Sequence, residues 1–131
     1  ILMADGTEKA IEEVVVGDKV LGAYEDGTQV VNTVEETFVH EGVYKTLIIN
    51  GAIEATPIHP FMTTRGWVEA GYLVVGDVMV GLTGNVAITS IETDSKGIVY
   101  NLETVPSHTY FANRLLVHNK LDTSDFDSVS N

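Results

Sequence analysis

The chain has 131 residues and a formal net charge of −12, because 19 acidic residues outnumber 7 basic ones. This length suits one domain with a hydrophobic core, and a hydrophobic fraction of 44% with 20% charged residues is typical of a globular fold and excludes general disorder. The negative charge argues against nucleic acid and anionic membrane surfaces as partners. The absence of cysteine excludes disulfides and cysteine-ligated metals within this chain.

The first half of the chain carries β-branched runs separated by turn signals. Residues 29–39 predict one strand and residues 44–50 predict the next. The pair Asn50-Gly51 predicts a tight hairpin turn that leads into a short strand at residues 52–55.

The second half repeats this style, with predicted strands at residues 86–93 and 98–105. Helical signal is limited to two pieces of at most a couple of turns, at residues 8–14 and 68–73. Short strands at this spacing predict an all-β fold.

Two sets of matching segments indicate an internal duplication. Residues 15–20 match residues 74–79 through the shared letters Val-Val-Gly-Asp, and residues 33–36 then match residues 90–93. In the second set, four residues recur 49 positions later: His59, Phe61, Arg65 and Val68 correspond to His108, Tyr110, Arg114 and Val117. We interpret the chain as two copies of one β unit packed around a pseudo-twofold axis.

The pattern stops after Asn119. Residues 120–131 contain only three apolar side chains and show no periodicity. We therefore predict a domain over residues 1–119, followed by a flexible flanking tail over residues 120–131.

Histidines are the best candidates for acid–base chemistry near neutral pH. His40 lies beside Glu41 at a strand end without a motif, which favours a structural or surface role. His59, His108 and His118 lie in marked surroundings: His59 follows Thr-Pro-Ile, His108 follows Pro-Ser, and His118 precedes an asparagine.

Two of these histidines have neighbours that suggest a specific reaction. An asparagine such as Asn119 can attack its own backbone carbonyl through its side-chain nitrogen, form a succinimide and break the following peptide bond, while His118 holds the carbonyl or protonates the leaving amine. Thr56 and His59, three residues apart on a turn, can converge on one peptide group and polarise it.

Two other kinds of site compete with this interpretation. His59, His108 and His118 could in principle supply three zinc ligands, but no acidic residue accompanies a histidine at the spacing of zinc-enzyme motifs. A serine hydrolase would need a residue such as Ser107 on a Gly-x-Ser-x-Gly elbow, which is absent. We therefore favour neither a zinc site nor a serine hydrolase.

Taken together and in order, these segments resemble the inteins and related Hint-fold self-processing domains, closest in style to a minimal intein or a bacterial intein-like domain. Residues 1–20 are similar to the N-terminal block of the family, and residues 56–61 to the block with the Thr-x-x-His motif. Residues 100–112 resemble the penultimate block, and residues 115–119 the C-terminal block. The resemblance implies an all-β horseshoe of two pseudo-twofold-related subunits with at most two short helical turns.

The resemblance also implies a single-turnover reaction on the flanking polypeptides (exteins) of the chain itself. Thr56 and His59 would polarise the N-terminal scissile peptide for an acyl shift. Asn119 would cyclise and break the bond that follows it, with His108 moving protons and His118 assisting at the Asn119 carbonyl. The domain would act as a monomer without a cofactor, in whichever compartment its host protein occupies.

The sequence departs from the family pattern at three points. The Cys or Ser that begins an intein, a few residues before the position of Ile1, is not in this chain; Asn101 stands where the family often has Asp; and Lys120 stands where splicing requires Cys, Ser or Thr. These departures keep an alternative open: a catalytically silent Hint remnant that serves as a β interaction module.

Overall fold

The computed structural model describes residues 1–119 and the backbone of residues 129 and 130. In this part of the chain the regular structure is almost entirely β. The strands are β1 (Lys19–Ala23), β2 (Gln29–Ile49), β3 (Ile53–Ala55), β4 (Pro60–Thr63), β5 (Gly66–Glu69), β6 (Val78–Met79), β7 (Val86–Ala87), β8 (Ile91–Val105), β9 (Thr109–Ala112), β10 (Leu115–His118) and β11 (Val129–Ser130). Two single 3-10 turns, Ile11–Glu13 and Ala70–Tyr72, fall within the two pieces with helical signal. The predicted all-β fold is confirmed.

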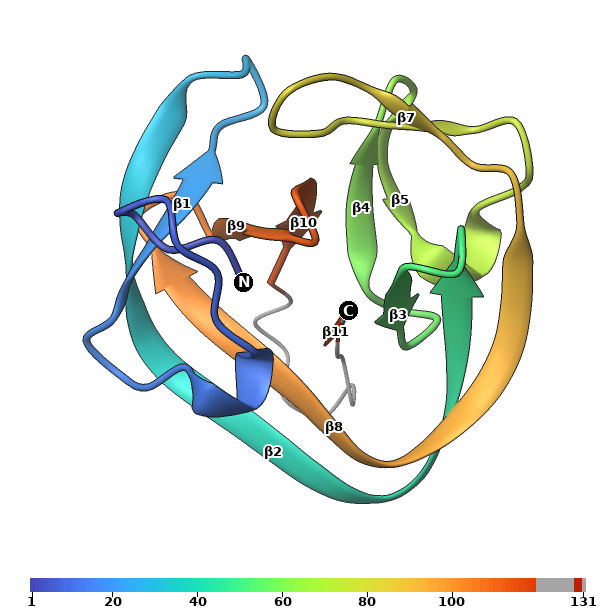
Figure 1. Ribbon diagram of the computed structural model, residues 1–131, viewed down its shortest axis with the longest axis horizontal. Coiled ribbons are helices and arrows are strands. Elements are labelled where there is room, and N and C mark those ends of the chain that lie inside the picture. The colour runs from blue at the N-terminus through green and yellow to red at the C-terminus, as the bar shows by residue number, and fades with distance from the viewer. Residues whose placement is uncertain (120–128, 131) are drawn as a thin grey trace.

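A long curved ribbon of two antiparallel strands forms the frame of the molecule. β2 pairs with β8 from Thr33↔Val105 to Ile49↔Ile91, and Figure 1 shows this ribbon bent around the other strands as a horseshoe. The prediction of two separate strands at 29–39 and 44–50 was wrong, because β2 is continuous. A register shift between Glu41 and Tyr44 lets it bend while its ladder continues, as a β-bulge does.

The same error affects the second half, where the predicted break between residues 93 and 98 does not exist and β8 runs unbroken. The predicted hairpin turn is confirmed. Asn50 and Gly51 both have positive φ, 56° and 64°, the conformation that a tight hairpin turn requires and that Asn and Gly adopt most readily. β3 then pairs back on β2 at Ile49↔Ile53.

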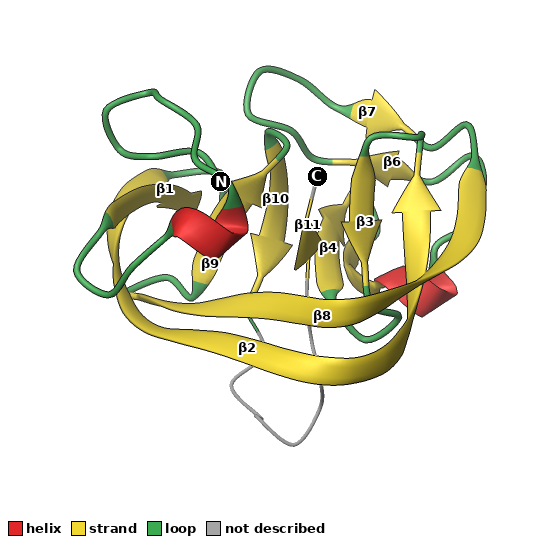
Figure 2. Ribbon diagram, turned by 60° about the horizontal axis from the view of Figure 1, so that its bottom comes forward, coloured by secondary structure: helices red, strands yellow, loops and turns green. Residues whose placement is uncertain are grey.

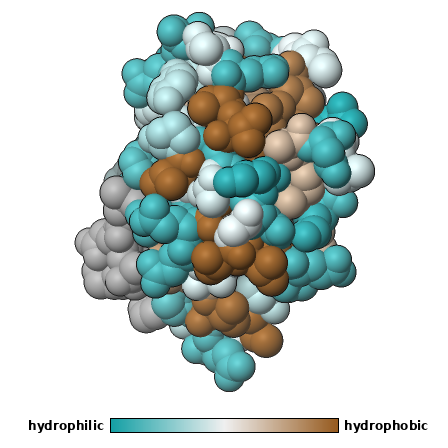
Figure 3. Space-filling view, turned by 90° about the vertical axis from the view of Figure 1, so that its left-hand side faces the viewer, coloured by the Kyte–Doolittle hydropathy of each residue, from teal (hydrophilic) through white to brown (hydrophobic). Residues whose placement is uncertain are grey.

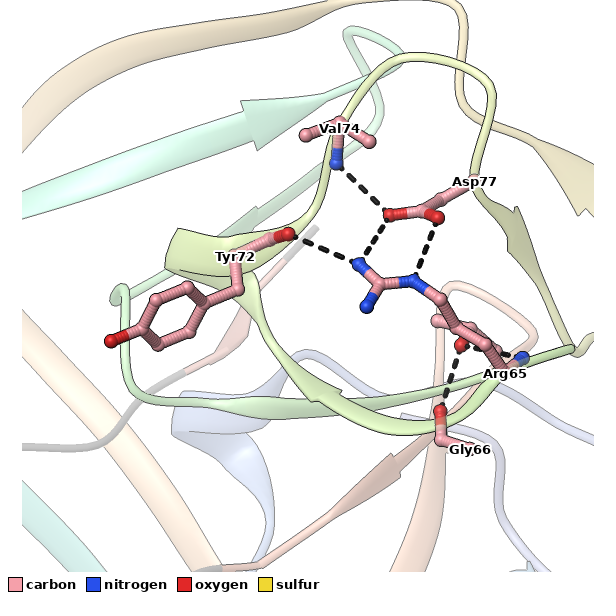
Figure 4. Close-up of polar contacts among 6 residues, drawn as sticks. Arg65, Gly66, Tyr72, Val74 and Asp77 are labelled. Carbon is pink, nitrogen blue, oxygen red and sulfur yellow. Dashed lines mark hydrogen bonds and ion pairs between the residues drawn. The ribbon is translucent and has the colours of Figure 1, made fainter.

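The two Val-Val-Gly-Asp loops have the same internal structure. Asp18 accepts a hydrogen bond from the Val15 amide at 3.1 Å, and Asp77 accepts one from the Val74 amide at 3.0 Å. Each carboxylate also binds a cation: Asp18 binds Lys9 at 3.0 Å, and Asp77 binds Arg65 through two contacts of 2.9 Å (Figure 4).

These contacts lower the pKa of both carboxyl groups. For Asp77 the largest cause is the hydrogen bond from the Arg65 side chain, and for Asp18 it is the Val15 amide.

The segments that recur 49 positions apart form two hairpins with identical register. Phe61 pairs with Val68 in the β4–β5 hairpin, and Tyr110 pairs with Val117 in the β9–β10 hairpin. The two hairpins meet at the pair Val117↔Phe61, between β10 and β4. The duplication that the sequence predicts is therefore present in the hairpins at its predicted offset.

The match between residues 33–36 and 90–93 needs a correction. Val20 pairs with Asn32 in β1–β2, and the corresponding pair in β6–β7 is Met79↔Val86. Asn32 therefore corresponds to Val86, which places the true match three residues earlier than predicted. The cause is a connection of different length between the paired strands in the two copies.

The hydrophobic core lies between the ribbon and the two hairpins. Its largest fully buried side chains include Tyr110, Phe61, Ile49 and Ile53. On the β1–β2 side, valines such as Val31 and Val39 remain exposed, and Figure 3 shows apolar patches on this face separated by hydrophilic residues. In the described part of the chain, no helix has the length and hydrophobicity needed to cross a membrane.

The predicted flexible tail at residues 120–131 lies mostly outside the described residues. Within it the structure describes only β11, which pairs antiparallel with β3 at Val129↔Ala55 and lies among the hairpin strands in Figure 2.

Candidate active site

At the end of β10, the imidazole of His118 contacts the backbone carbonyl of the next residue, Asn119. His118 Nδ1 lies 2.6 Å from the carbonyl oxygen of Asn119. On the other side of the same residue, the Asn119 amide donates to the carbonyl of His108 at 2.9 Å. Asn119 is therefore held through both of its backbone groups, and with a proton on Nδ1 the ring of His118 polarises the carbonyl.

The side chain of Asn119 is buried, with 1% of its surface exposed. Its Oδ1 atom lies 3.5 Å from the Thr104 hydroxyl, which also donates to the Thr109 carbonyl at 3.0 Å. Its Nδ2 atom has no hydrogen-bond partner among the described residues. A buried polar nitrogen without a partner is costly, and such atoms are often found where the group has a chemical role.

His108 precedes β9 in a left-handed conformation, with φ of 59°. This conformation is uncommon for residues other than glycine and clusters at functional sites. The centroid of its ring lies 6.4 Å from that of His118. Its Nδ1 atom is buried and has no hydrogen-bond partner in residues 1–119, so the carbonyl of His108 holds Asn119 while its ring stays close to the second imidazole.

Thr56 and His59 lie at the start of the first hairpin and are almost fully buried, at 3% and 0% exposed. They form a turn in which the His59 amide donates to the Thr56 carbonyl at 3.1 Å. The His59 ring packs edge-on against Phe61 and Tyr110, with centroid separations of 5.9 and 6.3 Å. The predicted Thr-x-x-His unit is thus a compact, buried turn.

Strand register places this turn beside Asn119. Phe61 pairs with Val117, and His59 and Asn119 each lie two residues beyond that pair, on the same side of it. In antiparallel strands such positions are neighbours that share a face. The structure therefore brings His59 to the edge of the sheet that carries Asn119, and His108 and His118 already meet there.

The start of the chain also reaches this region. The Leu2 amide donates to the carbonyl of Phe111 in β9 at 3.0 Å. Ile1 is buried, and Figure 1 shows the N-terminus inside the horseshoe beside β9.

Asn101, the residue that stands where the family often has Asp, is buried in β8. Its Oδ1 atom accepts hydrogen bonds from the Tyr110 hydroxyl at 3.0 Å and from the Leu102 amide at 2.8 Å. Since Tyr110 packs against His59, Asn101 supports the site through that ring.

Three residues around the site have no motif in the sequence. Trp67 packs edge-on against His118 with ring centroids 5.2 Å apart, and its indole nitrogen donates to Glu25 at 2.9 Å. Thr104 contacts Asn119, and Asn32 binds the residues on both sides of His108. Of these three residues, only Asn32 could have been noticed in the sequence, because it is a polar residue among the valines of a predicted strand.

An open cavity of about 510 Å³ adjoins His118. Its lining includes Tyr24, Glu25, Trp67 and Ser107. Within residues 1–119, no group of three or more His, Asp or Glu side chains is arranged to hold a metal ion, and this covers the set His59, His108 and His118.

This duplicated, almost entirely β horseshoe has the fold of the Hint class of domains. The chain belongs to this class: the family model described as the pretoxin HINT domain matches residues 1–120. Domains with this fold, inteins among them, are in general self-processing and lie between flanking polypeptides of a host protein.

Solved structures agree over nearly the whole chain. The bacterial intein-like domain from Clostridium thermocellum is 38% identical, with a TM-score of 0.75 over 91% of this chain and 93% of that one. The DnaB intein from Synechocystis sp. PCC 6803 is 18% identical, with a TM-score of 0.73 over 92% and 94%. The gp41-1 intein is 23% identical, with a TM-score of 0.72 over 91% and 92%, and these last two likenesses show the fold alone.

A short segment also matches a curated protein, the probable translation initiation factor IF-2 of Pyrococcus furiosus. The two are 48% identical over 40 residues, which are 29% of this chain. The chain spans only about 4% of the length of that protein, so the match carries nothing about the activity of the whole factor.

Proposed function

We propose that this domain cleaves its own chain between Asn119 and Lys120 by cyclisation of Asn119. The observation that supports this most strongly is the contact of 2.6 Å between His118 Nδ1 and the Asn119 carbonyl oxygen. It lies next to a buried side-chain nitrogen that makes no hydrogen bond to the described residues. Electrophile and nucleophile thus belong to one residue that is held from both sides.

In the proposed reaction, Asn119 Nδ2 forms a bond to the carbonyl carbon of Asn119 and loses a proton. The bond from that carbon to the Lys120 nitrogen breaks, and the departing nitrogen takes up a proton. His118 stabilises the negative charge that develops on the carbonyl oxygen, and His108 transfers the proton. Holding these groups together makes the attack intramolecular, which provides a large rate advantage.

The N-terminal step is the second part of the proposal. Thr56 and His59 polarise a scissile peptide at the start of the domain for an acyl shift, which requires a Cys or Ser upstream of Ile1. Its support is the position of this turn beside Asn119 by strand register, together with the hydrogen bond that ties Leu2, at the start of the chain, to Phe111 in β9. The substrates are the flanking polypeptides, and a single copy of the domain is sufficient.

Intact-mass measurement of the purified chain over days at several pH values tests the C-terminal step. We expect slow release of a peptide that begins at Lys120, and Asn119→Ala abolishes it because alanine has no nucleophile. Asn85→Ala, which changes an exposed asparagine in a loop, serves as the matched control and leaves the rate unchanged. Equal release by the wild type and Asn119→Ala is ordinary proteolysis and contradicts the proposal. A chain that stays intact under all conditions supports the silent interaction module.

A further inference from the structure

We propose that Asn32 is a positioning residue for the C-terminal step, because its side chain holds the loop that carries His108. This inference rests on the proposed function for its effect on rate. Asn32 lies in β2, distant in sequence from the site, and it is fully buried, with 0% of its surface exposed. It acts through the loop, since its side chain makes hydrogen bonds to Ser107 and Thr109.

The side chain binds the residues immediately before and after His108. Asn32 Nδ2 donates to the Thr109 carbonyl at 2.7 Å and to the Ser107 hydroxyl at 2.7 Å. Asn32 Oδ1 accepts from the Ser107 amide at 3.1 Å. One amide group therefore fixes the backbone on both sides of His108, and we call this set of contacts the Asn32 clamp.

Two further contacts extend the clamp to β1. The Ser107 and Thr109 hydroxyls lie 2.6 Å apart, and the Thr109 hydroxyl also binds the backbone of Ala23. The neighbouring Gly22 leaves room for this arrangement: a Cβ there would collide with Asn32 Nδ2 and lie 2.7 Å from the Thr109 carbonyl oxygen. The backbone of β1 thus packs directly on the clamp without an intervening side chain.

The other copy of the duplicated unit lacks this set of side chains. By strand register, Val86 takes the place of Asn32. By the hairpin offset, Ile58 and Pro60 take the places of Ser107 and Thr109. The polar clamp is therefore found only in the copy that carries His108, whose carbonyl binds Asn119. This argues against the clamp being needed for the fold in general.

The clamp bears on catalysis because His108 is used at two points. Its carbonyl accepts the Asn119 amide, and its ring lies beside His118. Its left-handed backbone, with φ of 59°, persists only if the surroundings hold it. Without the clamp, we expect the loop to relax, so that Asn119 and the proton-transferring ring lose their alignment.

Amide hydrogen exchange tests the positioning independently of cleavage. Asn32→Asp keeps the acceptor for the Ser107 amide but loses the donation to the Thr109 carbonyl and puts a carboxylate oxygen against that carbonyl. It therefore breaks the side of the clamp that follows His108, with little change in side-chain size. We expect the Asn119 amide to exchange at least about tenfold faster in this variant, because its acceptor is on the released loop. Val34→Ala, at the next inward position of β2, serves as a control for a general loss of stability. We expect the Asn119 amide to exchange more slowly in this control than in Asn32→Asp. Unchanged protection of the Asn119 amide in a folded Asn32→Asp protein overturns the proposal, whether or not the chain cleaves.

Cleavage rates then test the consequence. We expect Asn32→Asp to slow Asn119-dependent release by roughly 10–100-fold, the size typical of a misplaced catalytic group. In a His108→Ala background the same change has much less effect, since the group that it positions is already absent. An undiminished effect in that background contradicts a role through His108. Failure of the wild type to release any Asn119-dependent product refutes the proposed function, while the exchange result still decides the clamp.

Discussion

The two hairpins of this domain have the same backbone and different chemistry. In the first, the Ala70 amide donates to the His59 carbonyl at 2.9 Å; in the second, the Asn119 amide donates to the His108 carbonyl at 2.9 Å. Ala70 and Asn119 are thus corresponding residues in the two copies. The scaffold holds the backbone of this position in both hairpins, but only the second copy has a side chain that can attack its own carbonyl.

The neighbouring position shows the same division. His118 pairs with Thr109 in the second hairpin, and its counterpart Glu69 pairs with Pro60 in the first. The duplicated fold therefore holds a backbone peptide group in the same way in each of the two hairpins. We propose that each copy serves one step, with Thr56 and His59 acting on the N-terminal bond and the second hairpin on the C-terminal bond.

The largest effect should come from the imidazole on the Asn119 carbonyl. We expect His118→Ala to slow C-terminal release by roughly 10²–10⁴-fold, as for other lost acid–base groups. The control His40→Ala, on the ribbon, leaves the rate unchanged. The measurement is the rate of appearance of the Lys120 peptide by mass spectrometry, and a His118→Ala rate within twofold of the wild type would remove this histidine from the mechanism.

The first hairpin should control the other bond. With a Cys restored upstream of Ile1, we expect thiol to release the preceding polypeptide, because a thioester is then available for exchange. Thr56→Ala should slow this release by roughly 10²–10³-fold, the size typical of a lost polarising donor, and should affect the C-terminal step far less. Equal slowing of both steps by Thr56→Ala would show that the two copies do not divide the reaction.

The two Val-Val-Gly-Asp loops offer a comparison of stability. Arg65 lowers the pKa of Asp77 through two contacts, whereas a backbone amide and Lys9 lower the pKa of Asp18. A carboxyl group whose pKa is lowered by folding stabilises the folded protein at pH values above its ordinary pKa of about 4. This stabilisation is lost as the pH falls through the pKa of the group in the folded protein. We expect Asp77→Asn to lower the Tm by a few degrees at pH 7, Asp18→Asn by less, and both differences to shrink as the solution is made acidic enough to protonate the two carboxylates. Thermal melts against pH check this, and a difference that grows in acid would contradict it.

The smallest effect should come from the residue that leaves. In the proposed step Lys120 only accepts a proton on its backbone nitrogen, so we expect Lys120→Ala to release its tail at the wild-type rate. A large change in the time course would show that the proposed mechanism omits a contact to the leaving residue.

Much of the fold is predictable because it follows from local signals. The pair Asn50-Gly51 specifies its own turn, and the 49-residue repeat of His59 and Phe61 reports two hairpins with the same register. The continuity of β2 was not predictable, because a glycine such as Gly42 reads as a strand break when the long partner strand is unknown. The ladder to β8 carries the chain through that point as a bulge.

Only part of the site could be predicted from the sequence. The motif residues around Asn119 could be predicted, since their chemistry requires them to be close to one another in the sequence. Trp67, Thr104 and Asn32 reach the site from distant strands, so their roles depend on the folded chain. Only the inward alternation of β2 marks Asn32 as a polar residue in a buried position.

The chemical form of the new C-terminus tests the central claim most directly. Cyclisation leaves Asn119 as a succinimide, which is lighter by one water molecule than the product of hydrolysis after the same residue. We predict that mass spectrometry of the domain fragment at early times shows the succinimide, and that Asn119→Ala yields no such fragment. A fragment that ends from the outset in a free asparagine carboxylate would contradict cyclisation and identify the cleavage as hydrolysis.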